Sequence, residues 1–227
     1  GRNAIEKAKK AGLGQEGSIS LGVIESQLSE NFLPYALNTL RDHHPNIQLQ
    51  LIRGTFKELR NALLKEEIDI ALTMDFDLLE YPDTEVIYQP FFQASPKCVI
   101  STSHPLAKKD YIHLEELKNE PMIAIKPEIS QGAYDHIVQL CEIHGFIPEQ
   151  VHYATSTQNL LLMVESGLGF SVLDDNCISS TNVSVRSFPI YKSDPLILVA
   201  VWKRDNFNPV IPLFTSLLTA EPENTVS

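Results

Sequence analysis

The side chains best placed for chemistry in this sequence are hydroxyl and amide residues at the expected starts of helices. A helix start exposes free backbone N–H groups at the positive end of the helix dipole, and a nearby hydroxyl can add another donor. Such groups can hold a carboxylate or other polar group of a small ligand, although each residue alone is equally an ordinary N-cap. The candidates are Ser26 and Gln27, Thr55, Ser130 and Gln131, and Thr155 and Ser156.

Metal and cofactor chemistry have weaker support. His136, Cys141 and His144 fall on one expected helix, but their spacing turns His136 away from the face that the other two share. The three cysteines are widely spaced without a C-x-x-C pair, which favours reduced, buried thiols. The glycine pair in GLG (167–169) ends a helix and lacks the third glycine of a dinucleotide fingerprint. We expect no metal and no cofactor.

Catalysis is not favoured either. The sequence has no G-x-S-x-G elbow. Adjacent acids occur at 66–67, 115–116 and 174–175, and acids so placed are expected to be solvated. An enzyme would have to rely on Glu25 or His104. We therefore predict that the domain is not an enzyme.

Alternating strands and helices position the candidate residues. Apolar spacing predicts a first βαβαβ unit with parallel strands, whose ligands would lie beyond the carboxyl ends of the strands. Its elements are strands at 18–24, 47–53 and 68–74 and helices at 32–44 and 55–66.

A second unit repeats this arrangement. It contains an extended segment over 85–101, and its other elements are a short helix at 114–117, strands at 122–125, 151–153 and 170–173, and a helix at 134–144. The stretch TSTQNLLLMVESGLGFSVLDD again runs from hydroxyl residues through a helix and a glycine stop to a strand. Gly167 is expected to take a left-handed conformation at that stop. The repetition predicts two similar α/β units with a cleft between them.

Composition limits the partners. The 227 residues carry a net charge of -11, which repels phosphate backbones, so these residues are not expected to bind nucleic acid. No apolar run reaches the ~20 residues that span a bilayer, and the opening residues have no signal-peptide core. The chain begins at Gly1 rather than Met and continues with a basic, helix-forming stretch at 4–11, which suggests an internal fragment of a longer protein. The expected reduced thiols favour a cytoplasmic location.

Several motifs resemble the effector-binding domain of LysR-type transcriptional regulators. The resemblance runs in order from about Gly17 to Leu218. It includes G-x-I-x-L-G at 17–22, Leu33-Pro34, Pro45, Gly54-Thr55, Asp69, His104-Pro105-Leu106-Ala107 and VESGLGFSVLDDN at 164–176.

The resemblance implies a type 2 periplasmic-binding-protein-like α/β fold of two Rossmann-like subdomains. The first would combine 17–91 with 196–220, and the second would be 92–195. Residues 1–16 would end a linker helix and 221–227 would form a tail. Expected partners are a small-molecule effector in the cleft, a second copy in a homodimer or tetramer, and DNA only through an N-terminal helix-turn-helix outside this sequence.

Family effector positions carry over to this chain by place in the sequence. Thr55 would cap its helix and also donate to the effector, and the 25–31 loop is about a residue longer than the family pattern. The extra acids Glu25 and Glu30 disfavour a strongly anionic ligand. The expected effector-binding residues are Ser26, Gln27, Thr55, Phe92, Ser130, Thr155 and Ser156.

Two alternatives share the scaffold. A solute-binding protein of a transport system would have the same fold, but the basic stretch at 4–11 and the HPLA motif favour the regulator. An enzyme would need a catalytic group that faces the cleft.

Overall fold

The protein is described by a computed structural model over residues 1–2, 17–25 and 28–218, with side chains of 28–31 not described. Its first half is built on a five-stranded sheet. The strands are β1 (Gly17–Ile24), β2 (Ile47–Gly54), β3 (Ile70–Met74), β4 (Val86–Ala94) and β10 (Leu196–Lys203). Their order is β2-β1-β3-β10-β4. β1 runs parallel to β2 and β3, as predicted, whereas β10 is antiparallel to both β3 and β4.

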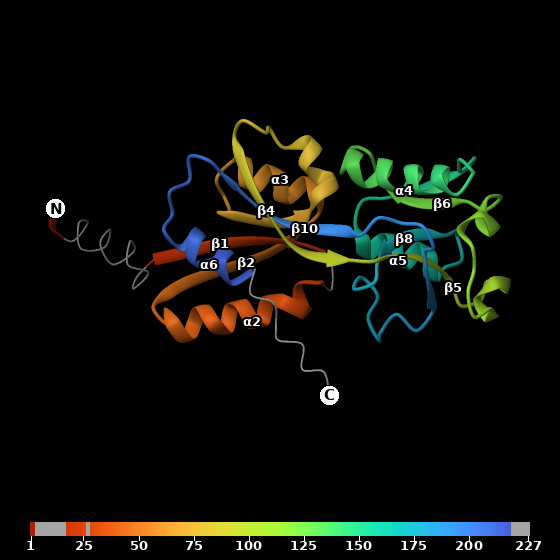
Figure 1. Cartoon of the computed structure of the whole chain (residues 1–227), viewed down its shortest axis with the longest axis horizontal. Coiled ribbons are helices and arrows are strands. Elements are labelled where there is room, and N and C mark those ends of the chain that lie inside the picture. Colours follow the sequence, from red (N-terminus) through yellow and green to blue (C-terminus); the bar gives the residue numbers. More distant parts are fainter. Residues whose placement is uncertain (3–16, 26–27, 219–227) are drawn as a thin grey trace.

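Helices cover both faces of this sheet (Figure 1). They are α2 (Leu28–His43), α3 (Phe56–Leu64) and α6 (Val210–Leu218), and the 3-10 helix η1 (Asp75–Glu80) follows β3. In β3, Ala71 faces the cluster beneath α3, while Leu72 faces the cluster beneath α2 and α6. Burial on both faces explains why this strand reads as a continuous apolar run. From α3, Leu59 and Leu63 are almost fully buried, and each contributes about 1.5–3 kcal/mol of hydrophobic stabilisation.

The second half carries two smaller sheets. β5 (Pro96–Ser101) lies between β8 (Ser171–Asp174) and β9 (Val185–Pro189) in antiparallel pairing, and β6 (Met122–Ile125) pairs in parallel with β7 (Val151–Ala154). The helices are α4 (Gln131–Ile143), α5 (Thr157–Glu165) and the 3-10 helices η2 (Pro105–Lys108) and η3 (Leu114–Leu117).

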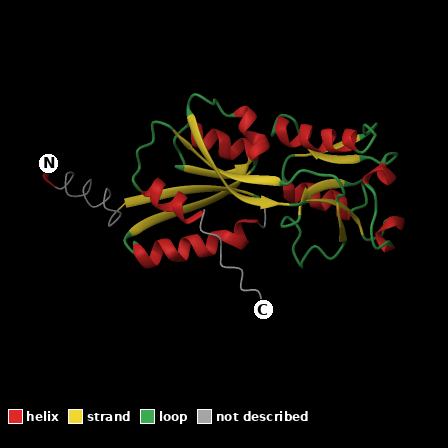
Figure 2. Ribbon diagram, viewed as in Figure 1, coloured by secondary structure: helices red, strands yellow, loops and turns green. Residues whose placement is uncertain are grey.

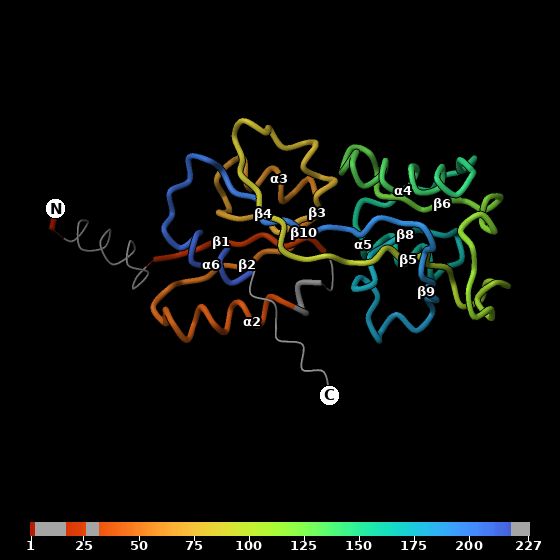
Figure 3. Tube along the Cα trace, in the orientation of Figure 1, coloured from red at the N-terminus to blue at the C-terminus, as the bar shows by residue number. Residues whose placement is uncertain are grey.

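The halves lie side by side along the long axis of the molecule (Figure 2). The chain passes between them twice, from β4 to β5 and from β9 to β10 (Figure 3). Strands within 17–94 and 196–203 therefore belong to one sheet, and those within 96–189 to the other two.

Several predicted boundaries shift. The helix expected at 55–66 ends at Leu64, because Glu66 has a φ of 63°, and the next strand begins at Ile70. The helix expected from 134 begins at Gln131, and the one at 114–117 is a 3-10 helix. Gly167 has the predicted left-handed conformation, with a φ of 77°.

Within the described ranges, no helix is long and apolar enough to cross a membrane.

Candidate functional site

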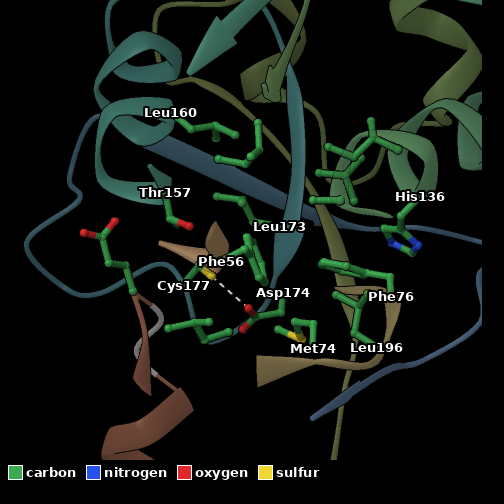
Figure 4. A pocket seen from close by; sticks show the side chains of 16 residues that line it. Phe56, Met74, Phe76, His136, Thr157, Leu160, Leu173, Asp174, Cys177 and Leu196 are labelled. Atoms are coloured by element: carbon green, nitrogen blue, oxygen red, sulfur yellow. Dashed lines mark hydrogen bonds between the residues drawn. The ribbon is translucent and has the colours of Figure 1, made fainter. Parts of the chain in front are cut away.

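A cleft lies where the two halves meet. Its first-half wall is formed by Ile24, Phe56, Met74, Phe76 and Leu196, and Leu160 of α5 faces it from the second half (Figure 4). The enclosed volume is about 50 Å³, so the two halves would have to move apart to admit more than a very small molecule. The mainly apolar lining with a few polar groups is nevertheless typical of a site for a small organic ligand.

At one end of this cleft, two helix starts approach each other from opposite halves. Thr55 belongs to the start of α3, and Thr155, Ser156 and Thr157 belong to the start of α5; all four line the same narrow opening. Thr55 Oγ1 accepts a hydrogen bond from Glu58 N at 3.2 Å. Ser156 Oγ accepts one from Asn159 N at 3.1 Å. These hydroxyls act as caps through their lone pairs, so each keeps its O–H hydrogen available for a ligand.

Glu25 stands between these helix starts. It follows β1, and its carboxylate accepts a hydrogen bond from the backbone N–H of Thr157 in α5. Burial raises its pKa, the negative charge of Glu58 adds to the rise, and Arg53 opposes it. Glu25 Oε2 is buried and has no hydrogen-bond partner among the described residues. Glu25 therefore links the two halves across the cleft, and one of its carboxylate oxygens has no hydrogen-bond donor among the described residues.

Asp174 and Cys177 form a second polar group in the wall. Cys177 Sγ donates to Asp174 Oδ2 at 2.8 Å, as Figure 4 shows, and Asn176 N donates to Asp174 Oδ1 at 2.9 Å. Asp174 is only 2% exposed, so the prediction that this acid is solvated is wrong. The turn after β8 folds back over the carboxylate and supplies donors that replace water. Cys98, Cys141 and Cys177 are all buried and form no disulfide, as predicted.

His136 lies in the cleft on the side opposite Thr157 (Figure 4). Its ring stacks on Phe76, with centroids 5.5 Å apart and an interplanar angle of 26°. Burial lowers its pKa, while the charges of Asp75 and Asp194 act in the other direction. His136 Nε2 is buried without a partner in the part of the chain that the structure describes. A neutral imidazole is thus available to a ligand.

In the described ranges, no group of three or more His, Cys, Asp or Glu residues could hold a metal ion. His104 is committed elsewhere: its Nδ1 accepts from Leu106 N, and its Nε2 pairs with Glu120.

Comparison with known proteins identifies the family. The family described as LysR substrate binding domain matches residues 13–222. The chain belongs to this family. Its fold is therefore the type 2 periplasmic-binding-protein-like α/β fold, and its role is that of a ligand-sensing regulatory domain.

Individual LysR-type proteins are similar over most of the chain. The regulator AlsR of Bacillus subtilis is 28% identical over 229 residues, which cover 97% of this chain and 72% of AlsR. BudR of Raoultella terrigena is 24% identical, over 80% of this chain and 62% of its own length. The solved effector-binding domain of QuiR in complex with shikimate is 20% identical, with a TM-score of 0.74 over 90% of this chain and 96% of that domain.

The structure brings three predicted effector residues of this LysR domain together. Thr55, Thr155 and Ser156 line one opening. Ser26 and Gln27 lie outside the described residues.

Phe92 and Ser130 lie in other environments. Phe92 packs on the core of the first half, with its ring centroid 6.1 Å from that of Phe32. Ser130 is fully buried, accepts from Ala133 N at 3.1 Å and donates to Asp77 Oδ1 at 2.7 Å.

Ser130 belongs to a buried network that joins the halves. Arg60 of α3 contacts both carboxylate oxygens of Asp77, at 2.8 and 2.7 Å, and its Nη2 donates to the carbonyl of Ile129 at 3.2 Å. Burial raises the pKa of Asp77 to about 6, although Ser130 and Arg60 favour its charged form. We call Arg60, Asp77 and Ser130 the buried clamp.

Close packing accompanies the clamp. A Cβ on Gly132 would lie 2.0 Å from the carbonyl oxygen of Phe76, so only glycine allows α4 to approach η1 this closely.

Sequence reasoning did not select His136 or Asp174 as cleft residues. His136 follows the Ser130 cap by six positions, on the helix whose start had been noted. Asp174 ends a strand next to the glycine stop. The sequence signal that could have identified His136 and Asp174 is their place on or beside a helix or strand that had already supplied a candidate residue.

Proposed function

We propose that this domain binds a small organic effector in the cleft and passes the binding signal to a DNA-binding part of a LysR-type regulator. The observation that carries the proposal is the convergence of two capped helix starts, from opposite halves, on one mainly apolar cleft. QuiR, whose domain is described in complex with shikimate, supports a small organic ligand for this fold.

A ligand in this cleft would touch both halves. We propose that 17–91 with 196–220 and 92–195 act as two subdomains, with 1–16 as a linker and 221–227 as a tail. The two short passages between the halves allow their relative angle to change, and an effector would favour the arrangement that it contacts best. No reaction is needed for this role.

A second copy of the chain is the proposed route for the signal. β2 forms an edge of the larger sheet and exposes Leu49 and Leu51, at 40% and 41%. An exposed apolar edge strand favours association. In a cytoplasmic homodimer or tetramer, a change in angle within each copy would alter the spacing of the attached DNA-binding domains.

Because the similar proteins are transcriptional regulators, they do not favour the alternative function, a solute-binding protein of a transport system. The acidic surface of this chain agrees with DNA contact through another domain.

The experiment is native mass spectrometry of the purified domain with identification of any released metabolite, followed by calorimetric titration of Thr55→Val and Thr155→Val. Each variant loses a hydroxyl donor, which should weaken binding by about 0.5–1.5 kcal/mol, or roughly two- to tenfold. Thr39→Val is the control, because that hydroxyl donates to Tyr35 O within α2, away from the cleft. Equal affinity in all three variants would count against the proposed site.

A further inference from the structure

Glu25 is the only described acid that links the end of β1 to the start of α5 across the cleft. Its carboxylate accepts from the N–H of Thr157, the first residue of α5. That N–H and the positive end of the helix dipole are what would attract a ligand carboxylate. In this domain, the protein's own carboxylate already occupies that place.

The rest of the cleft reinforces this negative character. Asp174 lies in the opposite wall, and no lysine or arginine is found among the described residues that line either opening. A carboxylate ligand would meet Glu25 with no cation among the described lining residues; Arg53, whose charge favours the ionised form of Glu25, does not line either opening. Bringing two carboxylates together in a partly buried site is strongly unfavourable.

Two buried side-chain atoms without hydrogen-bond partners in the described part of the chain indicate which ligand groups the cleft can bind. Glu25 Oε2 is a buried acceptor without a partner among the described residues, and a ligand donor would satisfy it. At the other side of the cleft, His136 Nε2 is also buried and unpaired among those residues. The side chains of Phe56, Met74 and Leu160 line the same cleft and give it its apolar character.

We propose that Glu25 determines effector specificity: the domain selects an amine or alcohol on an apolar body, whose N–H or O–H donates to Glu25 Oε2, and rejects the matching carboxylate. This inference rests on the proposed function, because it assumes that the cleft binds a small molecule.

The test uses probes that differ only in their polar group. Butylamine, butanol and butyrate form one series, and benzylamine, benzyl alcohol and benzoate form another. Binding to the folded domain is followed by two-dimensional NMR of backbone amides, with Thr157 as the reporter at the site. The proteins are the wild type, Glu25→Gln, and Glu149→Gln as a control that removes the same charge at an exposed position.

The wild type should bind the amines and alcohols more tightly than the carboxylates by about tenfold or more, as expected for one charge-assisted hydrogen bond. Glu25→Gln keeps an oxygen that can accept from Thr157 and adds an N–H₂ donor, so it should bind carboxylates better and lose the preference. Glu149→Gln should retain the wild-type order, which separates a local contact from the overall negative charge.

Two results would overturn the inference while leaving the proposed function intact. One is a wild type that binds a carboxylate as tightly as its amine and alcohol counterparts. The other is an unchanged preference in Glu25→Gln. If none of the six probes shifts a cleft amide in the wild type, the proposed small-molecule function itself fails.

Discussion

The buried clamp predicts strong coupling between two charges. Arg60 and Asp77 side chains are 9% and 0% exposed and lie 2.7 Å apart. Arg60→Met leaves the buried Asp77 carboxylate without its cation, and Asp77→Leu leaves Arg60 with only the partly exposed Glu80, whose Oε2 lies 3.3 Å from Arg60 Nη1. Each single variant should lower the free energy of unfolding by about 3–5 kcal/mol. The double variant removes both buried charges and leaves the Ser130 hydroxyl without its acceptor and Glu80 without this partner, at a cost of about 1–3 kcal/mol.

The two single effects would sum to about 6–10 kcal/mol, so the double variant should be far more stable than additivity predicts. Urea denaturation followed by circular dichroism measures all four proteins. Arg41→Met is the control, because Arg41 and Asp42 form an exposed pair with side chains 68% and 64% exposed; it should change stability by less than about 0.5 kcal/mol. Additive losses, or single losses no larger than that of the control, would refute the reasoning.

Three further outcomes follow from local geometry. Gly132→Ala should lower the melting temperature although alanine is the better helix former, because its Cβ would meet the carbonyl oxygen of Phe76; a rise would contradict the packing. The pKa of His136, followed by NMR, should lie below its ordinary 6.5 and fall further in Asp75→Asn; its stabilising effect is complete above pH 6.5 and is lost as the pH falls through the folded-state pKa. Ser156→Ala removes the cap of α5 and should cost about 1 kcal/mol in urea denaturation, and an unchanged midpoint would rule out the cap.

Local sequence patterns were sufficient for much of the fold. Apolar spacing predicted the parallel pairing of β1, β2 and β3 because each strand and crossover helix has its own period. Local sequence patterns did not predict the placement of β10 between β3 and β4. It joins segments more than 100 residues apart, and no local period encodes such a pairing. The expectation that the last strand returns to the first unit came from the resemblance to LysR-type regulators.

The cleft was predicted only where its residues sit at element starts. Thr55 and Ser156 were found because capping is a local property of sequence. Ser130 shows the same signal, yet its hydroxyl serves the buried clamp, because the neighbour that decides its role, Asp77, lies 53 positions away. Glu25 was recognised as an unusual acid, but its contact with Thr157 depends on how the halves approach each other.

The position of β10 also bears on how the chain folds as it is synthesised. Residues 96–189 form their sheets without strands from elsewhere, whereas the larger sheet lacks its fourth strand until residues 196–203 have been made. Until then, β3 and β4 have no strand between them, and the backbone edges that pair with β10 have no hydrogen-bond partner from that strand. The inserted half can thus fold on the ribosome before the half that begins first, and the larger sheet closes around a strand that arrives near the end of translation.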